Sequence, residues 1–122
     1  MFDIGMVKEI LKQIFDATQK IQRRFALVHS VNDFTGSETG MEKLDSICML
    51  LIAIGESIKN LDKKTNNELL SRYPNTEWKK IMGLRDIISH HYFDVDAEVI
   101  YDVCINHIKP LSSTIQKMID EL

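Results

Sequence analysis

Apolar side chains recur every three or four residues along most of this chain. That spacing lines one face of an α-helix, and no sustained two-residue alternation of the kind found in strands competes with it. It predicts one long helix over residues 3 to about 28 and a second over residues 41 to 61. The second helix is apolar around much of its circumference, which indicates a central position or contact with another subunit. We therefore expect an all-α fold.

Turn chemistry and proline set the limits of the other predicted elements. Residues 30–40 are rich in small polar residues and lack periodicity, so we expect an exposed connection there. Residues 67–73 are expected to form a short helix that ends before Pro74, because the residue preceding a proline is disfavoured in the helical conformation.

Two more long helices are predicted in the last third of the chain. The first begins with Asn75 or Thr76 as its N-cap. The second begins at an acidic start, Asp94 or Asp96, and continues to residue 122. Pro110 cannot donate a backbone hydrogen bond, so this last helix is expected to kink or break at or just before it.

Length and composition favour one globular domain. A chain of 122 residues is expected to form a single domain, residues 1–122, built as an up-and-down bundle of four to five helices. The longest apolar run, residues 47–54, is shorter than the ~18 residues of a membrane span, and the start lacks the basic residues of a signal peptide. We therefore expect a cytoplasmic protein with no membrane partner. Cys48 and Cys104 lack metal-binding spacing and are expected to be buried thiols.

Charge is segregated along the chain. The net charge of −3 argues against a protein that coats nucleic acid electrostatically. Residues 59–85, however, carry seven cations against three anions, a local net charge of +4. Residues 86–122 carry seven acids against two lysines, a net charge of −5. Two interpretations stay open: solvated helix faces, or a small anion-binding patch that leads to Arg85.

One predicted helix has an arginine where its period expects an apolar side chain. Its stripe consists of Trp78, Ile81, Arg85, Ile88 and Tyr92. Burying a bare charge is prohibitively costly, so Arg85 is expected to be paired or to line a cleft. The same stretch concentrates further reactive side chains, namely Asp86, Ser89, His90 and His91.

These residue types suit cleavage of a phosphodiester. Histidine exchanges protons near neutral pH, and arginine presents a charged fork that fits phosphate oxygens. An RNA 2′-hydroxyl attacking the adjacent phosphorus needs a base, an acid and a cation, and no metal or other cofactor. A positioned histidine typically contributes about 10² to 10⁴ in rate.

The same stretch has two other interpretations. One is a metal site made of His90, His91, Asp94 and Asp96. It is disfavoured because adjacent histidines diverge on a helix and the acids suit a helix start. The other is a capped helix end whose polar side chains are satisfied locally and have no chemical role.

Helical geometry separates the two central residues. Arg85, Ser89 and Tyr92 share a face, whereas His90 lies about 140° away around the axis, one turn beyond Asp86. Either the helix ends or distorts near residues 89–91, or Asp86 orients His90 beside a cleft into which Arg85 reaches. A two-fold dimer would bring two copies of each residue to one composite site.

The motif resembles a known signature. Arginine, four residues, histidine, one residue and tyrosine, with a polar residue after the arginine, is similar to the signature of the HEPN superfamily, and in particular of the HepT-like toxins. Here it consists of Arg85, Asp86, His90 and Tyr92. The resemblance extends over most of the chain, through residues 53–56, Trp78, residues 92–96 and the Pro110-Leu111 step.

The resemblance implies a HEPN-like, homodimeric, metal-independent ribonuclease that acts on RNA as the toxin of a toxin–antitoxin pair. Arg85 and His90 would then be catalytic and Asp86 would support them. Tyr92 would be the residue to which a cognate MNT-type nucleotidyltransferase antitoxin transfers AMP. The accessory candidates are Ser89 and His91, of which the latter is an alternative to His90 as the base.

A competing hypothesis comes from another functional class. The chain would be a non-catalytic helical partner, or a nucleotide-binding subunit, of a nucleotidyltransferase, and the polar motif would serve recognition. Tight binding to such an enzyme without ribonuclease activity or toxicity would favour it.

Overall fold

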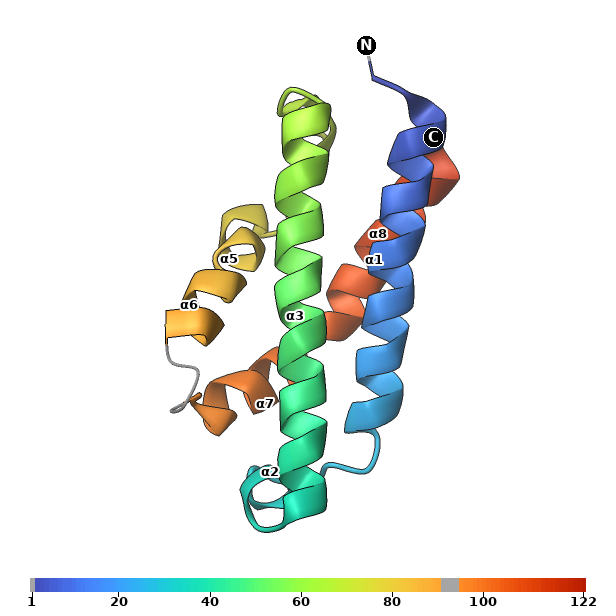
Figure 1. Cartoon of the computed structure of the whole chain (residues 1–122). Coiled ribbons are helices and arrows are strands. Elements are labelled where there is room, and N and C mark those ends of the chain that lie inside the picture. Colours follow the sequence, from blue (N-terminus) through green and yellow to red (C-terminus); the bar gives the residue numbers. More distant parts are fainter. Residues whose placement is uncertain (1, 91–94) are drawn as a thin grey trace.

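The computed structural model describes residues 2–90 and 95–122, with Ser89 and His90 described by their backbone alone. All regular structure in these ranges is helical, which confirms the all-α expectation (Figure 1). The helices are α1 (Ile4–Phe25), α2 (Asn32–Thr35), α3 (Glu38–Lys64), α4 (Glu68–Ser71), α5 (Trp78–Met82), α6 (Leu84–His90), α7 (Ala97–Asn106) and α8 (Ile108–Glu121).

The two long helices, α1 and α3, run in opposite directions side by side (Figure 1). Helix α1 begins after Asp3, whose carboxylate accepts a hydrogen bond from the Met6 amide at 3.1 Å. Helix α8 packs against α1, and α5 and α6 pack against α3. Figure 1 shows α5 and α6 on one side of α3 and α1 on the other, so α3 is central, as its broad apolar surface predicted. Within the described residues, no helix is both long and apolar enough to cross a membrane.

The expectation of an exposed connection over residues 30–40 is wrong in one respect. The segment contains α2, and Phe34 in that helix is completely buried. Its ring lies 6.1 Å from that of Phe25 and 6.4 Å from that of Tyr101, measured between centroids. The Tyr101 hydroxyl also donates to the His29 carbonyl oxygen at 3.0 Å. These aromatic contacts hold the segment against the bundle.

The helix predicted from Asn75 or Thr76 starts later and is divided. Glu77 is the residue at the N-cap position, so the predicted cap is wrong by one or two residues. The start is held instead by the Trp78 indole, whose Nε1 donates to the Tyr73 carbonyl oxygen at 2.9 Å. A turn at Gly83 then separates α5 from α6.

The last predicted helix is also divided, as expected from Pro110. Helix α7 is capped by Asp96, whose carboxylate accepts from the Glu98 amide at 2.9 Å. The break falls at His107, and α8 starts at the next residue. Pro110 therefore lies in the first turn of α8, where a missing backbone N–H leaves no helical hydrogen bond unmade.

Candidate active site

Arg85 is paired with a carboxylate from another helix. Its Nη1 donates to Oε1 of Glu56 on α3. The Arg85 side chain is 54% exposed and that of Glu56 is 37% exposed, so the pair lies at the surface. This confirms that the arginine is paired. The guanidinium group is accessible to a ligand from solvent, because only part of its surface is covered.

The apolar stripe around Arg85 holds α6 against the core. Trp78 and Ile88 are buried, and Ile81 is half-buried. Arg85 itself is exposed and pairs with Glu56 on α3. The stripe is therefore confirmed for its described apolar members, which lie on α5 and α6, and Arg85 lies outside the buried surface.

Gly55 explains why Glu56 and Arg85 can meet. A Cβ atom at Gly55 would lie 2.8 Å from the carbonyl oxygen of Ile81, closer than van der Waals contact allows. The backbone at the end of α5 thus rests directly on α3, one residue before Glu56. This close contact was not predicted from the sequence. The available signal was a glycine among the apolar residues of α3, which indicates close backbone approach.

A second cation shares the same carboxylate. Lys59 Nζ lies 3.9 Å from Oε2 of Glu56, one turn along α3. Glu56 therefore lies between two cations, Arg85 and Lys59, and the cluster keeps one positive charge in excess. Such a cluster attracts an anionic ligand.

The structure describes only some of the residues predicted to act with Arg85 on α6. Asp86 is exposed in the first turn of α6. The helix continues to His90, which puts that residue about 140° around the axis from Arg85 and one turn beyond Asp86. The side chains of Ser89 and His90, and the whole of His91 and Tyr92, lie outside the described residues, so their roles stay predictions.

Neither cysteine belongs to this site. Burial raises the pKa of the Cys48 thiol to about 11, with a smaller contribution from the nearby Asp45 carboxylate. Burial likewise raises the pKa of Cys104 to about 12, with a smaller contribution from Cys48. Both thiols are therefore protonated and inert at neutral pH, which confirms their interpretation as core residues.

Among the side chains that the structure describes, no group of three or more His, Cys, Asp or Glu comes together as a metal-ligand set. His91, Asp94 and the side chain of His90, all part of the alternative metal site, are not among them, so that site stays a prediction. The site built from described residues is the ion-pair cluster between α3 and α6.

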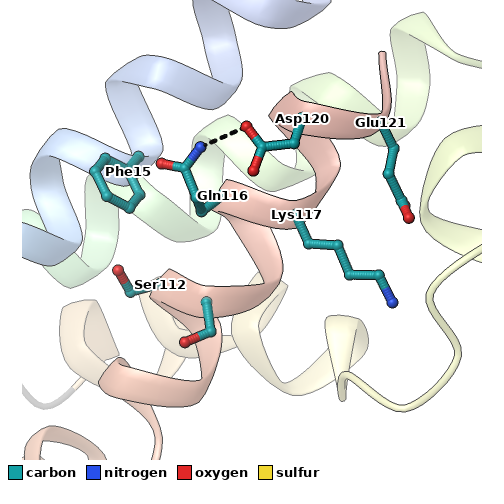
Figure 2. Close-up of a pocket in the computed structure, with 7 residues that line it drawn as sticks. Phe15, Ser112, Gln116, Lys117, Asp120 and Glu121 are labelled. Carbon is teal, nitrogen blue, oxygen red and sulfur yellow. Dashed lines mark hydrogen bonds between the residues drawn. The ribbon is translucent and has the colours of Figure 1, made fainter.

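A surface hollow lies elsewhere, between α1 and α8 (Figure 2). It encloses about 560 Å³ and is lined by Phe15 and by polar side chains of α8. Gln116 Nε2 donates to Asp120 Oδ1 at 2.9 Å across its wall. None of its lining residues belongs to the motif, so it is separate from the Arg85 cluster.

Comparisons with known proteins identify the family. A family model described as "Ribonuclease HepT-like" matches residues 7–118. A Methanocaldococcus jannaschii protein named "Putative RNase MJ0127" is 27% identical over 117 residues, which cover 94% of this chain and 91% of the relative. A Caldanaerobacter subterraneus protein named "Putative RNase TTE0752" is 31% identical over 68 residues, 56% of this chain and 57% of the relative. No solved structure matches the chain. The family match spans nearly the whole bundle, and the chain therefore belongs to the HepT-like ribonucleases.

Proposed function

We propose that this chain is a metal-independent endoribonuclease that cleaves RNA with Arg85 and His90 and serves as the toxin of a toxin–antitoxin pair. The observation that carries the proposal is the Arg85–Glu56 pair. It holds a half-exposed guanidinium group at the surface, on the same short helix that contains His90. Membership of a ribonuclease family supplies the substrate class.

The chemistry follows from these groups. A histidine takes the proton of the RNA 2′-hydroxyl, whose oxygen attacks the adjacent phosphorus. The bond from phosphorus to the 5′-oxygen breaks, and the leaving oxygen receives a proton from a second acid, which leaves a 2′,3′-cyclic phosphate. Arg85 stabilises the charge that develops on the phosphate oxygens. Asp86, one turn before His90, orients the imidazole.

The active form in this proposal is a homodimer. On a regular helix Arg85 and His90 diverge by about 140°, so one α6 directs them to different places. Two copies related by a two-fold axis supply Arg85 of one protomer and His90 of its partner to the same phosphate. The second pair provides the acid that a general acid–base mechanism needs.

Regulation in this proposal acts through Tyr92. A cognate MNT-type nucleotidyltransferase antitoxin transfers AMP to the phenol, and the new phosphodiester carries a negative charge. That anion competes with RNA for Arg85 and blocks the site. Incubation with the cognate transferase and ATP should add the mass of AMP to the peptide that contains Tyr92; a label on any other residue contradicts the assignment.

Cleavage of a short RNA in the presence of a chelator tests the proposed reaction. The expected product ends in a 2′,3′-cyclic phosphate, and the same sequence made as DNA should remain intact because it lacks the nucleophile. Cleavage of the DNA, or dependence on added metal, contradicts the mechanism. Absence of cleavage together with tight binding to a nucleotidyltransferase would favour the competing partner hypothesis.

A further inference from the structure

A line of basic residues extends from Arg85 along α3. Lys59 and Lys63 follow Glu56 at three and seven residues. At about 100° per residue, the three side chains leave α3 within about 60° of one another. Glu56 pairs with Arg85, so the two lysines extend from the arginine toward the C-terminal end of α3. We call Arg85, Lys59 and Lys63 the basic track.

The track is open to solvent. The Lys59 side chain is 41% exposed, and Lys63 is exposed. The ammonium group of Lys59 is 3.9 Å from Glu56, which is already engaged by Arg85. The positive charge of the track is therefore only partly neutralised.

Two other cations of the basic segment are engaged more closely. Arg72 lies 2.8 Å from Glu68, and Lys80 lies 2.8 Å from Glu77. These pairs are local to α4 and α5, and each cation has its own carboxylate. Lys59 and Lys63, in contrast, lie on α3, the helix that carries the carboxylate partner of Arg85.

We propose that the basic track binds the phosphate backbone of the RNA strand that flanks the scissile phosphate. This inference rests on the proposed function. Lys59 and Lys63 are separated by about 6 Å along the helix axis, so each can meet a different phosphate of one strand. Phosphate contacts position a strand without reading its sequence, so the track contributes affinity and direction but no base preference.

The charge of α7 reinforces this direction. Helix α7 and its N-cap carry three acids (Asp96, Glu98 and Asp102) and no lysine or arginine, so they repel a polyanion, whereas the segment 59–85 with its net charge of +4 attracts it. A strand held at Arg85 is accordingly drawn toward the C-terminal half of α3.

The test measures RNA binding without cleavage. Fluorescence anisotropy follows a labelled single-stranded RNA bound to the full chain carrying His90→Ala, across a series of salt concentrations. Each phosphate contact with a single strand contributes about −0.7 to the slope of log affinity against log salt. Removing two contacts, with Lys59→Ala and Lys63→Ala together, should reduce the slope by about 1.4 and weaken binding for every RNA sequence tested.

Helix α1 offers a matched control. Lys8 and Lys12 have the same four-residue spacing, with one lysine half-buried and the other exposed, as in the track. The double variant Lys8→Ala and Lys12→Ala removes the same charge from α1. Its slope of log affinity against log salt should be steeper than that of the track variant, because no phosphate contact is lost.

The outcomes separate this inference from the proposed function. If the unmodified chain cleaves RNA but the track and control variants have equal slopes, the track is wrong and the ribonuclease proposal stands. If the chain neither cleaves nor binds RNA, both are overturned. In the cleavage-competent chain, the track variant should raise KM with little change in kcat, as expected when uniform binding is lost.

Discussion

Arg85 on α6 donates to the Glu56 carboxylate on α3, directly beside the point where the Ile81 carbonyl meets Gly55. Both charged side chains are partly exposed. Ion pairs of this kind contribute about 0–1 kcal/mol to stability. We therefore expect the pair to fix the position of the guanidinium group and to contribute little to the stability of the fold.

Replacing Glu56 with glutamine should lower RNA cleavage while leaving the fold intact. Without the carboxylate, Arg85 samples more orientations, and displacement of a catalytic group by about 1 Å can reduce the rate by as much as 10²-fold. The free energy of unfolding should change by less than about 1 kcal/mol. Cleavage kinetics and urea denaturation of the same preparation measure the two effects.

A second glutamate serves as control for this experiment. Glu68 pairs with Arg72 at 2.8 Å in an exposed i,i+4 arrangement away from α6. Glu68→Gln removes the same charge and a comparable ion pair, and should retain full activity. Equal activity losses in the two variants would show that general charge, and not the position of Arg85, sets the rate.

Two glycines should respond in opposite ways to alanine. At Gly55 a methyl group would lie 2.8 Å from the Ile81 carbonyl oxygen, so Gly55→Ala should destabilise the fold by about 1–3 kcal/mol and push α5 away from α3. At Gly83 the nearest atom is the Lys79 carbonyl oxygen at 3.5 Å, and φ is −80°. Gly83→Ala should be neutral or stabilise by about 0.4–1 kcal/mol. Urea denaturation measures both, and equal effects would contradict the close helix contact.

Stability should fall at alkaline pH through the buried thiols. In the folded chain the pKa of Cys48 is raised from 9.0 to about 11 and that of Cys104 to about 12. A raised pKa stabilises the fold fully below the unfolded value and loses that contribution as pH rises toward the folded value. The free energy of unfolding should therefore decrease from pH 9.0 to about 11. The double variant Cys48→Ala and Cys104→Ala should flatten this decrease; an unchanged pH profile would contradict it.

A composite site predicts complementation between two inactive variants. Arg85→Ala and His90→Ala homodimers should each be inactive. Mixed under conditions that exchange subunits, they form heterodimers in which one protomer supplies Arg85 and its partner supplies His90. Part of the activity should return in the mixture, measured as RNA cleavage over time, because the heterodimer has one intact Arg85–His90 pair but lacks the second histidine that supplies the acid. A mixture as inactive as its components, although exchange is verified by mass spectrometry, would argue for a site within one protomer.

The repeating apolar spacing was enough to predict the helical class and the main helices, since burying one face of each helix dominates the fold. The break at His107 was predictable from Pro110, because proline lacks the backbone N–H that a helix interior needs. The burial of Phe34 could not be predicted. Its segment has no apolar period, and its partner Tyr101 is far away in the sequence.

The candidate site was also predictable only in part. An arginine in an apolar stripe required a partner, and the motif suggested the family. The identity of that partner depended on how α3 and α6 pack, which no local pattern encodes. Glu56 is the partner of Arg85 because Gly55, one residue before it, lets the Ile81 backbone approach α3.

In the proposed reaction, His90 and Arg85 cleave RNA without a metal. The direct test compares RNA cleavage by the purified chain and by His90→Ala, both in excess chelator, with circular dichroism to verify that the variant is folded. We expect cleavage by the unmodified chain and a loss of about 10² to 10⁴ in rate for the variant. Full activity of a folded His90→Ala protein would contradict it.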